Sequence, residues 1–353
     1  MNLSDFDFDL PDKLIALNPA IPRDSSKLLR VCSSESFENT IFNKLTDYLR
    51  EGDVLVVNDT KVIPSKIFGY KVNTKKELTK ISFTFFENRE NGQWKALAKP
   101  ARKINKNDLI FFKNADDKFY NLFAQIIDKN KGEVTFDFAS DSEKFIDILK
   151  EIGDVMLPPY ITSKRDIKEE DNSNYQTIFQ NNEGSIAAPT AGLHFTENLI
   201  KKIIKKGITI EKLTLNIGLG TFLPLREDNV QDNTLHSEYC YLSKQTAEKL
   251  NEVKNSKNRR IICVGTTALR TLETSFENGI FEPINKKTNK FIYPGIDINS
   301  IDALITNFHL PKSSLFILIC ALMGTNKMIK AYEYAIKNNY RFYSYGDACL
   351  LEK

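Results

Sequence analysis

Cysteine and histidine are scarce in this chain of 353 residues. The five cysteines lack the close, paired spacing of a zinc site or of a disulfide-rich scaffold. They are Cys32, Cys240, Cys263, Cys320 and Cys349. We therefore expect buried, reduced thiols in a cytoplasmic protein.

Long hydrophobic runs and a strong charge imbalance are also missing. The longest apolar run, Leu315 to Met323, is far shorter than the ~18 residues that a membrane span needs. The acidic N-terminus lacks the apolar segment of a signal peptide. Lysine plus arginine exceed aspartate plus glutamate by only three. A contact with nucleic acid would therefore have to come from a local patch.

The motifs of several large enzyme classes are absent. Gly218-Leu219-Gly220 has no third glycine, so neither a dinucleotide-binding nor a Walker pattern occurs. The Gly-x-Ser-x-Gly elbow of many hydrolases is missing as well. His236-Ser237-Glu238 matches the His-x-Glu of zinc deaminases, but the Pro-Cys-x-x-Cys pair of those enzymes is not present.

Two kinds of hydrophobic pattern divide the chain. In the outer segments, apolar runs such as Asp53–Val57 and Ala303–Ile305 alternate with helical periodicity, which predicts an α/β domain with a buried sheet. Between residues 66 and 139, six short β-rich runs favour a small antiparallel barrel or sandwich. The predicted division is a discontinuous α/β domain of residues 1–62 and 150–353, with an inserted domain of residues 63–149.

The stretch Ala187–Thr196 is rich in small residues and follows a long polar segment, residues 162–184, that we expect to act as a lid. Gly192 permits conformations closed to other residues, and His194 can exchange a proton near neutral pH. The stretch is a candidate ligand-binding loop. A tight strand-to-helix connection with a hydrogen-bonding histidine would produce the same pattern.

Polar residues follow several of the predicted strands, where parallel sheets place their ligands. Asn58 and Asp59 follow Asp53–Val57, although an Asn-Asp turn that closes a strand is the commoner explanation. Thr266 and Thr267 begin a helix after another strand, which fits either an anion site or ordinary helix capping. The segment Thr306–Pro311 follows Ala303–Ile305.

All three histidines, His194, His236 and His309, fall in these polar motifs. The coincidence favours one shared site with Glu238, hydroxyl groups and aromatic rings. Such a site suits proton transfer and the binding of a cationic or nucleoside ligand.

Together these motifs closely resemble those of the S-adenosylmethionine:tRNA ribosyltransferase-isomerases of queuosine biosynthesis. The resemblance covers essentially the whole chain. It rests on Ala187–Thr196, His236–Tyr239, Gly265–Arg270, Thr306–Pro311 and Tyr340–Ala348, supported by Val57–Thr60 and Leu157–Ile161.

The resemblance implies an α/β domain with an inserted six-stranded antiparallel β-barrel. It also implies a reaction in which the ribosyl group of S-adenosylmethionine passes to 7-aminomethyl-7-deazaguanine (preQ1) at the tRNA wobble position and is isomerised there. Adenine and methionine are released, and epoxyqueuosine-tRNA remains. S-adenosylmethionine is a consumed co-substrate, so we expect no cofactor and no metal. We further expect a monomer with no membrane contact.

The proton transfers that this reaction needs lead to our own hypothesis for the site residues, because histidine and glutamate can perform them near pH 7. We expect His194 or His309 to act as the base, Glu238 to meet the sulfonium or the substrate amine, and His236 to share in catalysis. Tyr239 and Tyr293 would supply π faces. Ribose, adenine or carboxylate contacts would come from Thr266, Thr267, Asn307 and Asp347. The remaining candidates are Thr190, Gly192, Arg270, Asn58 and Asp59 for substrate, and Arg23, Lys27, Lys61 and Arg341 for RNA.

The chain departs from the usual family pattern at a few positions. Asn216 stands where a histidine is common, so either that histidine is not an obligatory base or this protein is impaired. Lys27 and Lys61 replace frequent arginines, which keeps the charge but loses bidentate hydrogen bonding. The alternatives are a catalytically silent RNA-binding homologue and another S-adenosylmethionine-dependent enzyme that modifies tRNA, such as a methyltransferase.

Overall fold

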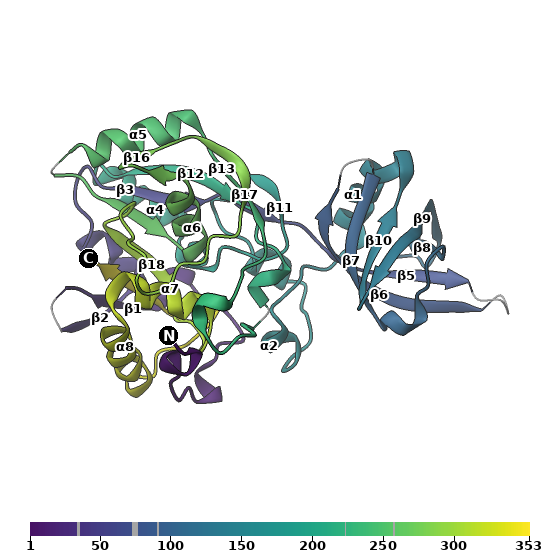
Figure 1. Ribbon diagram of the computed structural model, residues 1–353, viewed down its shortest axis with the longest axis horizontal. Coiled ribbons are helices and arrows are strands. Elements are labelled where there is room, and N and C mark those ends of the chain that lie inside the picture. Colours follow the sequence, from purple (N-terminus) through teal and green to yellow (C-terminus); the bar gives the residue numbers. More distant parts are fainter. Residues whose placement is uncertain (34–35, 73–76, 90–91, 223, 257) are drawn as a thin grey trace. The chain divides into compact units, whose positions relative to one another are not determined.

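The computed structural model describes residues 1–33, 36–72, 77–89, 92–222, 224–256 and 258–353 (Figure 1). The chain divides into two compact units. Unit 1 comprises residues 1–61 and 158–353, and unit 2 comprises residues 62–157. Unit 2 therefore extends past the expected end at residue 149, which falls inside helix α1 (Ser142–Ile152).

Unit 1 is built on one nine-stranded sheet with the order β17-β13-β12-β3-β14-β18-β19-β1-β2. Strands β12, β3, β14 and β18 run parallel, whereas β13 and β19 run antiparallel to their neighbours β12 and β18. The strands are β1 (Lys27–Val31), β2 (Phe37–Ile41), β3 (Val54–Asn58), β12 (Thr209–Leu215), β13 (Glu238–Leu242), β14 (Ile261–Val264), β17 (Ile284–Thr288), β18 (Ala303–Asn307) and β19 (Ala348–Glu352).

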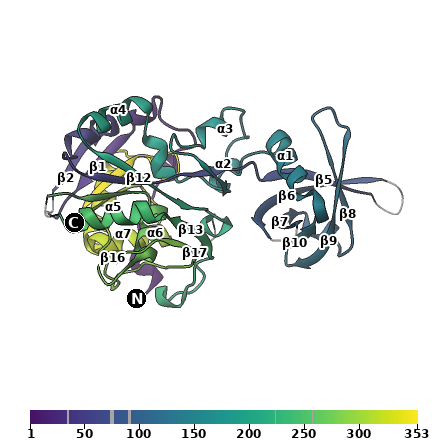
Figure 2. The same ribbon diagram turned by 90° about the horizontal axis from the view of Figure 1, so that it is seen from above.

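Helices cover both faces of this sheet, as Figure 2 shows for α4 on one side and α5 to α7 on the other. The helices are α4 (Glu197–Lys205), α5 (Lys244–Lys254), α6 (Thr266–Ser275), α7 (Ser314–Met323) and α8 (Thr325–Lys337). Every residue of β3, β14 and β18 is buried. The continuous apolar runs therefore predicted these central strands correctly, because both faces of a parallel sheet lie under helices.

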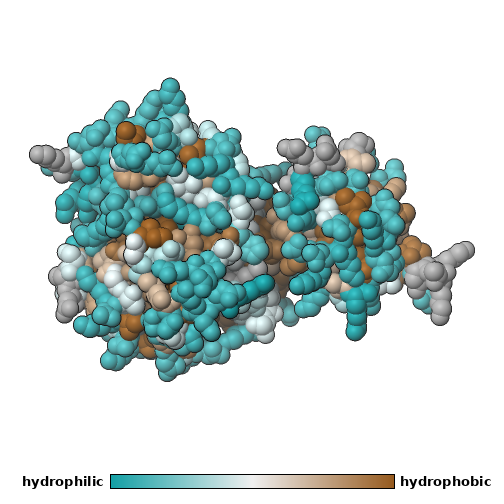
Figure 3. All heavy atoms as spheres, in the orientation of Figure 1, coloured by the Kyte–Doolittle hydropathy of each residue, from teal (hydrophilic) through white to brown (hydrophobic). Residues whose placement is uncertain are grey.

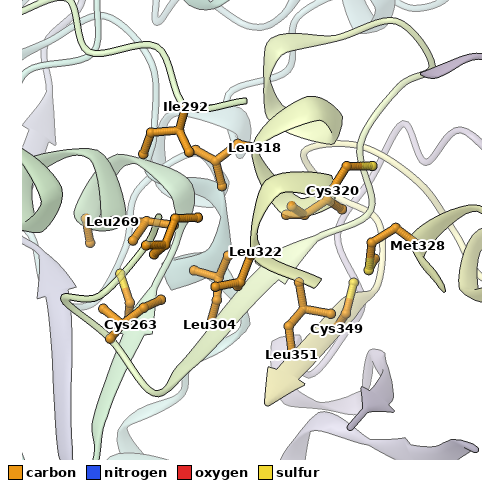
Figure 4. Packing of buried hydrophobic residues seen from close by; sticks show 14 of the residues in the cluster. Cys263, Leu269, Ile292, Leu304, Leu318, Cys320, Leu322, Met328, Cys349 and Leu351 are labelled. Carbon is orange, nitrogen blue, oxygen red and sulfur yellow. The ribbon is translucent and has the colours of Figure 1, made fainter. Parts of the chain in front are cut away.

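Two hydrophobic clusters occupy the two faces. Along β3, Val54 and Val56 belong to one cluster, whereas Leu55 and Val57 belong to the other, as strand alternation requires. Figure 4 shows the first cluster, in which side chains of the sheet pack against α6, α7 and α8. Four of the five cysteines are buried, and Cys32 is half-buried.

The segment expected to be a lid belongs to unit 1 and is anchored there by a few buried residues, although most of its side chains are exposed. It contains α3 (Asp171–Asn174) and β11 (Asn182–Ser185), which pairs with β4 (Thr60–Val62). Asp171 and Tyr175 are buried, and Arg165 donates two hydrogen bonds to the Asp171 carboxylate. The remaining short elements of unit 1 are α2 (Pro159–Thr162), β15 (Phe276–Glu277) and β16 (Ile280–Phe281).

Unit 2 consists of six antiparallel strands that close into a barrel with the order β10-β7-β6-β5-β8-β9. Its strands are β5 (Lys66–Val72), β6 (Leu78–Asn88), β7 (Gln93–Lys99), β8 (Leu109–Lys113), β9 (Phe119–Asn130) and β10 (Glu133–Asp137). Inward side chains form a separate core that includes Trp94, the only tryptophan of the chain. Helix α1 adds Phe145, Ile148 and Leu149 to this core.

Among the described residues, no single helix is long and apolar enough to cross a membrane. Helices α7 and α8 pass such a test only as a pair, and the pair is bent by 115°.

Candidate active site at one edge of the large sheet

Most of the predicted site residues lie along one edge of the nine-stranded sheet. The carboxyl ends of β12, β3, β14 and β18 share this edge because these strands are parallel. Strands β13 and β19 begin there, because they run in the opposite direction. Glu238 starts β13, Thr266 follows β14, Asn307 ends β18 and Asp347 precedes β19. Strand direction thus gathers residues that are far apart in the sequence.

A pocket at this edge contains three of the predicted residues, Glu238, Arg270 and His236. The Glu238 carboxylate forms an ion pair with the Arg270 guanidinium and accepts a 2.9 Å hydrogen bond from the Gly218 N–H. Glu238 and Arg270 are buried, and His236 is exposed at the pocket. Arg270 Nη2 is buried and has no hydrogen-bond partner within the described parts of the chain. The pocket therefore combines an anchored carboxylate, an accessible imidazole and a guanidinium N–H group that can still bind.

Several pocket residues were not identified from the sequence. The other lining residues are Gly220, Thr221, Leu235, Phe291, Ile292, Ser314, Leu315 and Leu318. Phe291 contacts the predicted Tyr293, with ring centroids 5.5 Å apart. Nothing in the local pattern of α7 separates its pocket-lining face from its core face, because the helix is apolar almost throughout. Only tertiary packing reveals these residues.

His194 is buried on one face of the sheet. In the neutral form with Nδ1 protonated, it donates to Ser26 Oγ at 2.8 Å, and its Nε2 accepts from Asn307 Nδ2 at 3.2 Å. Its ring stacks on Phe42, with centroids 4.9 Å apart. Burial, with smaller contributions from Arg341 and Arg23, lowers the pKa of His194 to about 3. The imidazole is therefore neutral, and both ring nitrogens are engaged.

His309 is also buried, but in a different environment. Its Nε2 lies 3.0 Å from Thr306 Oγ1, and its backbone N–H donates to the Tyr332 hydroxyl at 3.0 Å. Burial lowers the pKa of His309 to about 3. Thr306 pairs across the sheet with Cys349, which belongs to the hydrophobic cluster under α7 and α8.

The sequence predicted one site for all three histidines, and the two buried ones have different surroundings in the structure. His194 hydrogen-bonds to Asn307, and His309 hydrogen-bonds to Thr306, the residue before Asn307 in β18. Successive side chains of a strand point to opposite faces of the sheet, so β18 lies between the two imidazoles. His236 is the one histidine at the pocket.

Asn58 and Asp59 act as links between strand ends. Asn58 Nδ2 donates to the Leu215 carbonyl at 3.0 Å and to Thr267 Oγ1 at 3.2 Å. Asp59 accepts from Thr214 Oγ1 at 2.7 Å and from the Asn182 amide. Both are buried and hydrogen-bonded, as in the alternative of a strand-closing turn. Asn216, which stands where a histidine is common, accepts from Thr60 Oγ1 at 2.8 Å.

The residues of the small-residue loop face the protein interior. Thr190 begins a 3-10 helix, η8 (Thr190–His194). A Cβ at Gly192 would lie 3.0 Å from Thr177 Cγ2, so this glycine allows close packing of the chain against itself. Thr266 is also buried, whereas Tyr239 is 37% exposed.

Two of the four predicted RNA contacts bind backbone carbonyls. Arg23 donates to the Gln176 and Ser173 carbonyls at 2.7 and 2.9 Å, and its partial burial lowers the pKa of its guanidinium. Lys27 Nζ donates to the Asn338 and Asn339 carbonyls, just beyond α8. Both contacts give these cations a role within the fold.

The other two predicted RNA contacts pair with carboxylates. Arg341 binds the buried Asp347, which also accepts a 3.0 Å hydrogen bond from the Lys27 backbone N–H. Lys61 pairs with Glu183 at 3.0 Å on the surface. Within the described residues, no group of three or more His, Cys, Asp or Glu side chains is placed to hold a metal ion.

Comparison with known proteins identifies the family of this chain. A family model described as queuosine biosynthesis protein matches residues 3–351. S-adenosylmethionine:tRNA ribosyltransferase-isomerase of Brucella anthropi is 43% identical over 100% of this chain and 98% of its own length. The enzyme of the same name from Phenylobacterium zucineum is 41% identical, with 99% of each chain covered. The chain belongs to the S-adenosylmethionine:tRNA ribosyltransferase-isomerase family.

A solved structure of this family has a related fold. The crystal structure of S-adenosylmethionine tRNA ribosyltransferase from Thermotoga maritima is 32% identical to the chain, with a TM-score of 0.56. The match covers 99% of this chain and 100% of the other. These family members are thus similar to this chain along nearly its whole length.

Proposed function

We propose that this protein transfers and isomerises the ribosyl moiety of S-adenosylmethionine onto preQ1 at the wobble position of tRNA. The products are epoxyqueuosine-tRNA, adenine and methionine. Similarity to enzymes of this name over the full chain supports the proposal. In this proposal S-adenosylmethionine is a consumed co-substrate, no metal or further cofactor takes part, and the enzyme is a cytoplasmic monomer.

The observation that carries the proposal is the pocket with Glu238, Arg270 and His236 at the strand edge. The reaction requires removal of a proton beside the sulfonium, an uncharged amine and an acid that helps adenine to leave. Carboxylate and imidazole groups can perform these transfers near neutral pH. The pocket brings both kinds of group to one recess with apolar walls, where charge interactions are stronger than in water.

We assign recognition of the carboxylate and the sulfonium of S-adenosylmethionine to the ion pair between Arg270 and Glu238. Arg270 Nη2 would donate to the methionine carboxylate, since guanidinium groups bind carboxylates well and this nitrogen is buried without a partner in the described chain. Glu238, anchored by Gly218 and Arg270, would face the sulfonium. Phe291 would present its ring to the same cation.

We assign proton transfer to His236, which lines the same pocket as Glu238. His194 and His309 were the expected bases, but a pKa of about 3 makes each a weak base at neutral pH. The hydrogen bonds of His194 to Ser26 and Asn307 instead suit a positioning role at the strand ends. His236 is exposed at the pocket and can reach a bound ligand.

Product analysis with S-adenosylmethionine and tRNA that bears preQ1 tests this function. Adenine and methionine released in equal amounts are expected. Formation of S-adenosylhomocysteine would identify a methyltransferase instead. Binding of the tRNA without turnover would identify a silent RNA-binding homologue. Light scattering coupled to size-exclusion chromatography tests the proposed monomer separately.

A further inference from the structure

Unit 2 carries an unusual set of side chains on the outside of its barrel. Along β9, Leu122 and Ala124 point into the core, whereas Phe119 and Phe123 are 46% and 56% exposed. Outward positions of β5 and β8 likewise hold aromatic residues. We call the resulting surface the aromatic face, formed by Phe68, Tyr70, Phe111, Phe119 and Phe123. Contiguous exposed hydrophobic surface on a small domain commonly marks a binding site.

Four of the five rings of the aromatic face form a connected row across three neighbouring strands. Tyr70 on β5 contacts Phe119 on β9 with centroids 6.0 Å apart. Phe111 on β8 contacts Phe119 and Phe123 at 6.1 and 5.8 Å. Space filling shows brown hydrophobic side chains among hydrophilic ones on the surface of this unit (Figure 3). Aromatic rings at this spacing can stack against successive planar groups of a ligand, such as neighbouring bases of a single nucleic-acid strand.

Lysines reach over the same rings. Lys113 Nζ lies 4.9 Å from the centroid of Tyr70 and 5.0 Å from that of Phe119. Lys80 Nζ lies 3.9 Å from the centroid of Phe68. Lys113 also pairs with Asp117 at 2.8 Å. The Lys113 side chain is only 13% exposed, whereas that of Asp117 is 79% exposed, so a phosphate could take the place of the solvent-facing carboxylate.

The charge of the strand region favours an anionic partner. In residues 62–138, lysine and arginine outnumber aspartate and glutamate by six, which is twice the excess of the whole chain. Helix α1 and its flanks carry the acidic balance of unit 2, and α1 packs into the barrel core through Phe145, Ile148 and Leu149. The basic excess of unit 2 thus falls in the segment of sequence that contains the barrel strands, and its sign favours binding of RNA.

We propose that the aromatic face binds unpaired nucleotides of the tRNA substrate by stacking their bases on Phe119, Phe123 and Tyr70. Lys80 and Lys113 bind the adjoining phosphates. Proteins recognise single-stranded RNA through this combination of aromatic platforms and cationic side chains. The proposal rests on the proposed function, because that function supplies the RNA.

The composition of the aromatic face argues against a protein partner. The cores of protein interfaces are depleted of lysine, whereas here lysine ammonium groups lie directly over the rings. Bases have π faces that stack on phenylalanine whatever their sequence, and the sugar-phosphate backbone supplies the anions that the lysines need. A nucleic acid satisfies both features with one ligand.

The test compares tRNA kinetics of the full-length enzyme with those of a double variant, Phe119→Ala/Phe123→Ala. Both rings are exposed, so their removal leaves the barrel core intact. We expect the KM for preQ1-tRNA and the Kd for the same tRNA to rise about tenfold for each ring lost, a typical effect of one base–aromatic stack. The kcat and the KM for S-adenosylmethionine should not change.

Further variants separate stacking from other effects. Phe119→Tyr/Phe123→Tyr should bind tRNA like the unaltered enzyme, whereas Phe119→Leu/Phe123→Leu should bind as weakly as the alanine variant, because leucine is apolar but has no ring. Leu97→Ala, at another exposed apolar position of the barrel, is the matched control and should have no effect. Lys113→Ala should reduce the slope of the logarithm of the tRNA binding constant against the logarithm of salt concentration by about one, because one phosphate contact is lost.

Two results would overturn the proposal. One is equal tRNA affinity of the unaltered and double-alanine proteins, measured by fluorescence anisotropy. The other is full affinity of the leucine variant, which would indicate nonspecific apolar docking. A self-association that the alanine variant abolishes, with tRNA affinity unchanged, would assign the face to a second copy of the chain. Absence of adenine release by the unaltered enzyme would refute the proposed function. The anisotropy measurement would still test whether the aromatic face binds tRNA.

Discussion

At the scale of single residues, the two buried imidazoles make stability depend on pH. His194 and His309 have a pKa of about 3 in the folded protein, because burial disfavours the charged form. In the unfolded chain their pKa is about 6.5, so the unfolded state takes up protons first as the pH falls. Stability contributed by the neutral rings is complete above pH ~6.5 and is lost progressively below it.

The expected loss is about 2 kcal/mol for each histidine between pH 7 and pH 5, where most unfolded carboxyl groups remain ionised. Urea unfolding at the two pH values measures it. The variant His309→Asn should lose about half of this pH dependence, whatever its absolute stability. A free energy of unfolding that is constant between pH 7 and pH 5 would contradict the buried, neutral state of both rings.

The carboxylate in the pocket leads to a second prediction at this scale. Glu238→Gln removes the negative charge that we propose faces the sulfonium, and it leaves Arg270 unpaired in a buried position. We expect kcat for adenine release to fall at least about 100-fold, as when a positioned electrostatic group is lost. Unfolding should become easier by about 3 kcal/mol. Glu248→Gln, whose pair with Lys244 is exposed, is the control and should match the unaltered enzyme.

The sequence identified polar residues near the strand ends as site candidates, but it could not show which of them line the pocket and which only join strands. Glu238 and Arg270 were candidates, and the structure places both in the pocket. Asn58 and Asp59 were candidates for the same reason, yet their side chains are used to join strands. Whether a buried polar group binds substrate or backbone depends on partners distant in the sequence, so local composition cannot decide it.

At the scale of elements, the loop between β12 and β13 holds His236 in place. A Cβ at Gly220 would lie 2.6 Å from His236 Cβ, closer than real contacts allow. Gly220→Ala should therefore displace His236 and lower kcat about tenfold or more, with little effect on the midpoint of thermal unfolding. Gly218→Ala is the matched control, because its Cβ would meet only Glu238 atoms at 3.9 Å or beyond. Equal activities of the two variants would argue against a catalytic role of His236.

Element prediction succeeded where a single pattern dominated. The apolar runs of β3, β14 and β18 were sufficient. Strand β19 was not identified, because Ala348–Glu352 is short and follows an aromatic, polar segment. Its place between β18 and β1 is decided by long-range pairing that no local pattern encodes. The placement of His194 and His309 on opposite faces of β18 follows from the same strand geometry.

At the scale of the whole molecule, the two units have separate cores and should unfold separately. Trp94 is the only tryptophan, and it packs in unit 2 against Phe85 and Phe145. Its fluorescence should therefore report the unfolding of unit 2 alone. We expect an isolated fragment of residues 62–157 to fold, since Lys66 and Asp154 join its two ends through backbone hydrogen bonds. The fragment should give the same tryptophan transition as the full chain, and an unfolded fragment would contradict the autonomy of the unit.

The central claim is that the ribosyl group, not the methyl group, of S-adenosylmethionine reaches the tRNA. The most direct measurement uses S-adenosylmethionine labelled in the ribose with ¹³C and in the methyl group with deuterium, followed by mass spectrometry of the tRNA nucleosides. The account predicts ¹³C in the modified wobble nucleoside and deuterium only in free methionine. Deuterium in the tRNA, or no label in it at all, would contradict the account.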